Sequence, residues 1–166
     1  MSKVITVSRE LGSGGREVGL RLAKKLGIPF YDKELIAMAA EDSNISEDLF
    51  HANDEVIAGQ KRINYDDYAT VDPFSPVYEV PVSDQLFVIQ SKIIQRLAAN
   101  GPCVIIGRCA SAILRSAGYH PLSVFIYADS ADRAKRIAAR NGLDEKRALH
   151  KAQKVDRMRK HHFDFY

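Results

Sequence analysis

Short apolar runs alternate with amphipathic helical patterns along the chain, and this alternation constrains the fold more than any other feature. Four apolar runs are typical of buried strands: 3–7, 28–31, 103–106 and 122–128. Apolar residues at helical spacing follow the first of them between Val18 and Leu26, where Gly27 ends the pattern. Strands separated by helices pair in parallel through right-handed crossovers. The sequence therefore predicts an α/β fold built on a parallel sheet.

Length and composition are ordinary for one soluble domain. The 166 residues are 46% hydrophobic and 27% charged, which suffices for one core. The sequence contains neither an apolar run long enough to span a membrane nor the pattern of a signal peptide. The chain has two cysteines, Cys103 and Cys109. Two are too few for a zinc site made of cysteines, and we expect both to be reduced thiols. We therefore expect a cytoplasmic protein with no membrane partner and no metal ligands of its own.

Positive charge is concentrated toward the end of the sequence. Between Arg133 and Lys160 there are eleven Lys or Arg and three Asp or Glu, although the net charge of the whole chain is only +3. Such a segment forms a solvated helix face or attracts polyanions such as phosphates and nucleic acid. No recognised RNA-binding motif accompanies the charge, so we expect no nucleic-acid partner.

A glycine-rich segment joins the first predicted strand to the first predicted helix. It consists of Gly12, Ser13, Gly14 and Gly15, and Arg16 follows directly. Glycines let backbone N–H groups turn toward an anion, and a helix N-terminus adds the positive end of its dipole. The segment fits neither the dinucleotide pattern G-x-G-x-x-G nor the strict ATP-type pattern G-x-x-x-x-G-K-[ST]. It is either a phosphate-binding loop or a tight turn without a ligand, and Arg16 favours phosphate.

Other polar residues fall at the carboxyl ends of predicted strands, where parallel sheets bind their ligands. Asp32 follows the second apolar run and either orients a ligand or caps the next helix. Arg108 follows the third run and either grips an anion or forms a surface ion pair. Arg133 and Arg136 lie one helical turn apart, so both can face one ligand, or they belong to a solvated face.

Three segments of the chain resemble the cytidylate kinase-like proteins. Residues 5–17 match the string I-T-x-S-R-E-x-G-S-G-G-R-E at every specified position. Residues 104–110 resemble the string V-I-x-G-R-C-A, and residues 156–159 resemble D-[KR]-x-R. Asp32 stands where cytidylate kinases carry an Asp at the end of the second strand. The resemblance extends over most of the chain.

This resemblance implies the fold of a P-loop nucleoside monophosphate kinase, a three-layer α/β/α arrangement around a parallel sheet. Residues 1–166 would form a single kinase-like domain. Its core would comprise 1–32 and 83–140, with a monophosphate-binding insertion at about 33–82 and a mobile lid at about 141–149.

The family normally continues past the aromatic stretch Phe163–Tyr166 into another strand and a closing helix. Either this sequence is part of a longer chain, or a second chain supplies the cover. In the second case we expect self-association as a homodimer, because the aromatic stretch and a sheet edge would otherwise stay exposed.

The resemblance also implies an activity: ATP-dependent phosphorylation of a nucleoside monophosphate, with CMP or dCMP as the first choice and Mg²⁺ as the metal. The residues that would bind the donor phosphates are Gly12, Ser13, Gly14, Gly15 and Arg16. The residues that would neutralise the transferred group are Arg16, Arg133 and Arg136. The residues that would bind the acceptor are Asp32, Arg108 and Arg157.

Several departures from cytidylate kinases leave a second function open. The lysine of the usual ATP-binding loop is absent, and so is the Ser or Thr that holds magnesium. Ile106 and Cys109 stand in place of two Asp residues of cytidylate kinase. Each lost group normally holds Mg²⁺ or stabilises developing charge on phosphate. The alternative is therefore a catalytically weak or inactive nucleotide-binding or sensor protein that retains the fold.

Overall fold

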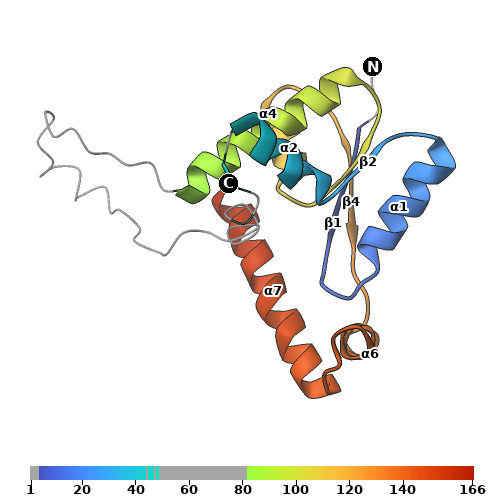
Figure 1. Ribbon diagram of the computed structural model, residues 1–166. Coiled ribbons are helices and arrows are strands. Elements are labelled where there is room, and N and C mark those ends of the chain that lie inside the picture. Colours follow the sequence, from blue (N-terminus) through green and yellow to red (C-terminus); the bar gives the residue numbers. More distant parts are fainter. Residues whose placement is uncertain (1–3, 44, 47, 49–81) are drawn as a thin grey trace, which may run out of the picture.

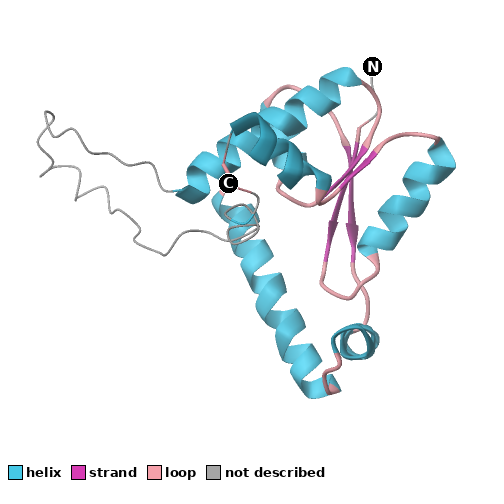
Figure 2. Ribbon diagram, viewed as in Figure 1, coloured by secondary structure: helices cyan, strands magenta, loops and turns pink. Residues whose placement is uncertain are grey.

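The computed structural model describes residues 4–43, 45–46, 48 and 82–166. Within these residues one parallel sheet has the strand order β2-β3-β1-β4. Its strands are β1 (Ile5–Arg9), β2 (Phe30–Tyr31), β3 (Val104–Ile106) and β4 (Leu122–Ile126). The strands lie between helices, as Figure 2 shows. The predicted α/β fold with a parallel sheet is confirmed.

The described helices follow the strands as the alternation predicts. They are α1 (Gly15–Leu26), α2 (Glu34–Ser43), α4 (Val82–Asn100), α5 (Ala110–Ser116), α6 (Ser130–Asn141) and α7 (Glu145–Phe165). Gly27 ends α1 in a left-handed conformation with φ 65°. The sequence pattern predicts that the last helix ends in the 150s, whereas α7 continues to Phe165. Most of the insertion predicted at 33–82 lies outside the described residues.

Side chains of β3 alternate between two cores, one on each face of the sheet. Val104 and Ile106 pack with Ala23 of α1. Ile105 points the other way, into the larger core, where its partners from α2 and α4 include Leu35 and Ile94. Figure 1 shows α1 on one side of the sheet and α2 and α4 on the other. Because both faces of its central strands are covered, the sheet is a rigid support for the loops at its carboxyl end.

A third cluster joins α6 to α7. Ala134 and Ile137 of α6 pack against Ala148 and Ala152 of α7, and the three alanines let the two helices approach closely. At the other end of α7, the ring of Tyr166 stacks on Phe87 of α4 with 3.8 Å between ring centroids. Helix α7 therefore runs from α6 to α4, as Figure 1 shows. None of the described helices is long and apolar enough to cross a membrane.

Candidate phosphate-binding site

The glycine loop connects β1 to α1 through a backbone that requires glycine. Gly12 and Gly14 have φ angles of 81° and 86°, in the left-handed region that side chains disfavour. Gly15 is needed for space, because a Cβ there would lie 2.5 Å from Cβ of Arg9. The Ser13 hydroxyl donates a hydrogen bond to the Glu10 carbonyl oxygen at 2.9 Å and closes the turn. The loop thus leads directly into the N-terminus of α1, where backbone N–H groups are available to an anion.

Arg133 and Asp156 hold the other side of this loop. Arg133 Nε donates to the Leu11 carbonyl oxygen at 2.8 Å, and its guanidinium pairs with Glu10 at 2.9 Å and with Asp156. Asp156 Oδ1 also accepts the Leu11 N–H at 2.8 Å. Arg133 is buried, and the cavity beside the loop is lined without it. The sequence predicts that Arg133 contacts phosphate, but the structure places its guanidinium on the loop backbone and its acidic neighbours.

Asp32 lies between two arginines at the end of β2. Arg16 Nε donates to Asp32 Oδ2 at 2.7 Å. Arg108 Nη1 donates to the Asp32 carbonyl oxygen at 2.7 Å and lies 3.6 Å from Oδ1. The Arg16 side chain is half exposed and lies over the Phe30 ring, whereas the Arg108 side chain is buried. The structure therefore brings Arg16, Asp32 and Arg108 together in one ion-pair chain, although they come from three different parts of the sequence.

Beside the glycine loop and this ion-pair chain is an open cavity of about 330 Å³. Its cationic lining residues are Arg9, Arg16, Lys33, Arg108, Arg136, Arg140, Lys151 and Arg159. Its acidic lining residues are Glu10, Glu17 and Asp32. Cations outnumber acids by eight to three. A hollow with this balance and with a helix N-terminus in its wall attracts phosphate groups.

Arg136 covers the glycine loop from α6. A Cβ placed on Gly14 would lie 2.6 Å from Arg136 Nη1, so the guanidinium occupies the space above the glycine. Glu17 lies at the same rim, and its backbone N–H, aided by Arg140 and Arg136, lowers the pKa of its carboxyl group. Arg136 thus lies beside the loop that the sequence predicts to bind phosphate, and Arg140, one turn further along α6, also lines the cavity.

The structure does not bring Arg157, which the sequence assigns to the acceptor, to either of two cavities near the glycine loop. Arg157 is exposed, and neither the cavity beside the loop nor its neighbour includes it. Arg159 lines both cavities, and its Nη1 donates to the Arg9 carbonyl oxygen at 3.4 Å. The motif alone cannot distinguish the two arginines, because only the rotational phase of α7 decides which one faces the sheet.

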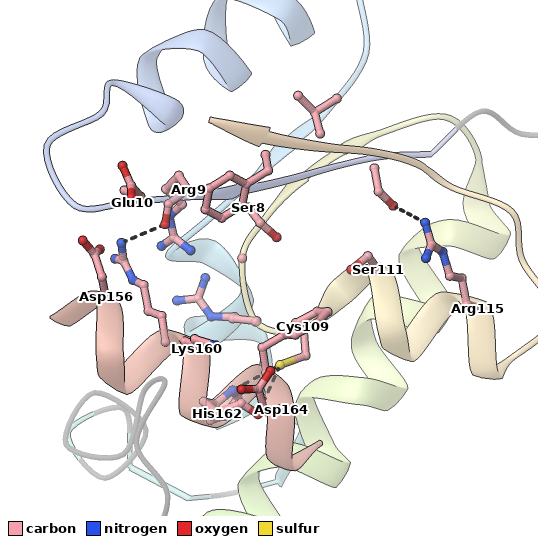
Figure 3. A pocket seen from close by; sticks show the side chains of 17 residues that line it. Ser8, Arg9, Glu10, Cys109, Ser111, Arg115, Asp156, Lys160, His162 and Asp164 are labelled. Atoms are coloured by element: carbon pink, nitrogen blue, oxygen red, sulfur yellow. Dashed lines mark hydrogen bonds between the residues drawn. The ribbon is translucent and has the colours of Figure 1, made fainter. Parts of the chain in front are cut away.

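A second cavity of about 600 Å³ adjoins the first. It lies between α7, the β3–α5 turn and the sheet, and Figure 3 shows the side chains that line it. Arg108 and Arg159 line both cavities. No pattern in the sequence indicates this second cavity, because it forms only where α7 passes beside β4.

A metal centre made only of protein ligands is not found in the part of the chain that the structure describes. There, no cluster of three or more His, Cys, Asp or Glu side chains is arranged to hold a metal ion.

Comparison with known proteins gives one family match that spans nearly the whole chain. The model of the cytidylate kinase-like family matches residues 4–166. Among solved structures, an uncharacterized protein from Eubacterium ventriosum ATCC 27560 is 30% identical, with a TM-score of 0.68 over 99% of this chain and 77% of that one. No significant match is found among curated proteins.

Two further solved structures are more distant. A gluconokinase from Sinorhizobium meliloti 1021 is 18% identical with a TM-score of 0.48, over 93% of this chain and 74% of its own. TT1252 from Thermus thermophilus is 19% identical with a TM-score of 0.47, over 96% of this chain and 84% of its own.

Proposed function

The chain belongs to the cytidylate kinase-like family, and from this premise we propose that it transfers a phosphoryl group from ATP to a nucleoside monophosphate, with CMP or dCMP as the first substrates to test. The family supports a nucleotide kinase-type function. The observation that carries the proposal is the cationic cavity in which the glycine loop, Asp32 and Arg108 meet. We assign the reaction to the cytoplasm, where ATP and nucleoside monophosphates are available.

On the donor side, the glycine loop and α1 receive the phosphates of ATP. The backbone N–H groups of Gly14 and Gly15 would bind the anion at the start of α1, and Arg136 lies above Gly14. Arg16 supplies a second cation from α1, although Asp32 holds it at 2.7 Å in the structure. Phosphoryl transfer depends on positioning and on neutralising charge, and these groups provide both.

On the acceptor side, Arg108 and Asp32 receive the monophosphate. Asp32 fixes the Arg108 guanidinium through its carbonyl oxygen at 2.7 Å, so the cation is oriented before a substrate arrives. Lys33 and Arg159 line the same cavity and add positive charge. Arg159 therefore takes the role that the sequence motif suggests for Arg157.

Magnesium fits the site as a companion of the ATP phosphates rather than as a protein-bound ion. Bound Mg²⁺ would neutralise charge that develops on the transferred group. Mg²⁺ bound with phosphates is commonly held by one or two carboxylates and water, and Glu17 and Asp32, which both line the cavity, would supply them. Arg133 acts in this proposal as a positioning residue, since it holds the loop through Leu11 and Glu10.

The alternative function is nucleotide binding without transfer. Arg16 stands near the place of the usual loop lysine, but its side chain is engaged by Asp32. If that ion pair persists with ATP bound, the transferred phosphate lacks the cation that Arg16 would supply, and the protein acts as a sensor.

An ADP-release assay with CMP, dCMP and UMP separates the two functions. The proposal predicts ADP formation that depends on both Mg²⁺ and a monophosphate, and that is faster with CMP or dCMP than with UMP. ATP binding without monophosphate-dependent ADP formation would support the sensor instead.

A further inference from the structure

Cys109 and His162 form a buried pair outside the proposed phosphate site. Cys109 Sγ lies 3.2 Å from His162 Nδ1 and 3.8 Å from the His162 carbonyl oxygen. Each residue is 7% exposed. Figure 3 shows the two side chains pointing toward one another at the wall of the second cavity. The phosphotransfer proposed above uses neither of them.

The backbone that carries Cys109 is unusual. Gly107, Arg108 and Cys109 have φ angles of 68°, 53° and 53°, so three consecutive residues are left-handed. For a residue other than glycine this conformation is strained, and such strain concentrates at functional sites. The turn directs Arg108 toward Asp32 and Cys109 toward His162.

Two aromatic rings fix the orientation of the His162 imidazole. Phe87 meets it edge-on at 6.0 Å between ring centroids, and Tyr166 lies at 4.9 Å. In the tautomer that carries its proton on Nε2, Nδ1 accepts a hydrogen bond from the Cys109 thiol. A cysteine beside an imidazole can lose its proton to it, and the thiolate is the reactive form.

The cavity in front of the pair is large and cationic enough for a small anionic molecule. Its volume is about 600 Å³. Its cationic lining residues are Arg9, Arg108, Arg115, Arg159 and Lys160, and its acidic lining residues are Glu10, Asp156 and Asp164. Cys109 lines this cavity directly.

Cys103 is a contrasting thiol in the same chain. It is 2% exposed within the apolar core beneath α4, and neither cavity includes it. Burial raises the pKa of its thiol to about 11, so it holds its proton. The chain thus contains one cysteine that meets an imidazole and a cavity, and one that meets only apolar side chains.

We propose that Cys109 and His162 form a nucleophilic thiol site that exchanges with small anionic disulfides, a class represented by oxidised glutathione. His162 accepts the thiol proton, and the Cys109 thiolate attacks one sulfur of the disulfide. The old S–S bond breaks as the new one forms. The leaving thiolate takes a proton from the imidazolium, so the oxidation of Cys109 is balanced by reduction of the released thiol.

The adduct would also affect the neighbouring site. It would stand beside Arg108, which lines both cavities. On the proposed function, we expect weaker monophosphate binding by the adduct. The adduct itself is detected by mass, so a failure of this inference and a failure of the kinase function are distinguishable.

The experiment compares chains that each retain one cysteine. Cys103→Ser and Cys109→Ser proteins are incubated with oxidised glutathione near neutral pH, and adducts are followed by intact mass spectrometry. We expect one adduct, reversed by dithiothreitol, on the Cys103→Ser protein, and none on the Cys109→Ser protein. Addition of His162→Gln to Cys103→Ser should slow the reaction about tenfold, because it removes the proton acceptor. Preferential reaction of Cys103 would overturn the proposal.

A second measurement needs no change at His162. The rate of alkylation by iodoacetamide is measured against pH for the Cys103→Ser protein, in which the pair is intact. We expect the rate to reach its plateau below the ordinary cysteine pKa of about 8.5. A plateau at or above that pH would show that the Cys109–His162 contact is a structural hydrogen bond only.

Discussion

Arg108 combines a strained backbone with a buried and paired charge. Its φ angle is 53°, its side chain is 3% exposed, and its guanidinium is held by Asp32. A fold retains such a costly arrangement where the side chain must be placed accurately. The proposed reason is recognition of the acceptor monophosphate, which a fixed guanidinium binds through two parallel hydrogen bonds.

The first prediction concerns this residue. Arg108→Ala should weaken CMP binding about tenfold or more, which corresponds to the loss of a charge-assisted hydrogen bond, and leave ATP binding near normal. Calorimetric titration of each nucleotide measures both effects. Arg96→Ala is the control, because Arg96 forms an ion pair with Asp42 on the exposed surface of α4. Equal loss of CMP and ATP affinity, together with a lower melting temperature, would identify Arg108 as a structural residue instead.

At the scale of elements, the glycine loop and α6 depend on one another. Gly14 leaves the space that the Arg136 guanidinium occupies, and Arg133 of α6 binds the Leu11 carbonyl oxygen. Asp156 of α7 binds the Leu11 N–H. The loop is therefore held by two helices that follow it by more than a hundred residues, and its shape depends on the packing of α6 against α7.

The second prediction compares two left-handed glycines. Gly14→Ala and Gly142→Ala should each lower the free energy of unfolding by about 1 kcal/mol, since both positions have positive φ. Only Gly14→Ala should also reduce ATP affinity, because its Cβ displaces Arg136, whereas a Cβ on Gly142 meets nothing within 4 Å. Urea denaturation and calorimetry measure the two effects. Equal ATP affinity in the two variants would contradict a role for the glycine loop in phosphate binding.

Hydrophobic periodicity and terminal glycines predict a helix or strand well when its own residues carry the whole pattern. The end of α1 before Gly27 agrees with the helical pattern between Val18 and Leu26. The length of α7 was underestimated, because its second half carries few buried residues and is stabilised by contacts with α4 at Tyr166. Such contacts between distant segments leave no periodic signal in the sequence.

The candidate site could be predicted only in part, because some of its residues are marked by local patterns and others by contacts between distant segments. The glycine loop, Asp32 and Arg108 were indicated by their places at strand ends, which parallel topology brings together. Arg133 forms ion pairs with Glu10 and Asp156, and Arg159 donates a hydrogen bond to the Arg9 carbonyl oxygen. Both interactions depend on how α6 and α7 cross the loop. No local pattern encodes that crossing, so the sequence assigned Arg133 to phosphate and did not separate Arg157 from Arg159.

Across the described part of the molecule, the β4 edge of the sheet carries exposed apolar side chains. Within the described residues β4 pairs with β1 alone. Leu122, Phe125 and Tyr127 are 61%, 59% and 76% exposed on or beside β4, and Phe163 and Phe165 of α7 are about half exposed. Tyr166, in contrast, packs against Phe87. An exposed strand edge with apolar side chains favours pairing with another chain.

The third prediction follows from this edge. The chain should form a homodimer at micromolar concentration, and Leu122→Lys should weaken it, because a charge on an edge strand opposes pairing. Sedimentation velocity measures the change. Val88→Lys is the control, since Val88 is a similarly exposed apolar residue on α4. A wild-type monomer over a wide concentration range would show that the β4 edge is not an interface.

The fourth prediction concerns alkaline pH. Burial raises the pKa of Cys103 from 9.0 to about 11. Burial and a hydrogen bond to Asp84 raise that of Tyr166 from 10.0 to about 12. Both groups bind their protons more tightly when folded, so their stabilising contribution is complete below about pH 9 and is lost as the pH rises toward 12. The free energy of unfolding in urea should therefore fall over this range.

The control for this effect is the double variant Cys103→Ala with Tyr166→Phe. It removes both titrating groups, and phenylalanine retains the stacking on Phe87. Its stability should depend less on pH between about 9 and 12 than that of the wild type. Identical pH dependence in the two proteins would refute the assignment to Cys103 and Tyr166.

Calorimetric titration of ATP shows whether the cationic cavity beside the glycine loop binds nucleotide phosphates. The wild-type chain should bind one ATP per molecule. Arg16→Ala should bind it about tenfold more weakly, because one charge-assisted contact is lost. Absence of any ATP, ADP or phosphate binding by the folded wild-type protein would contradict the account.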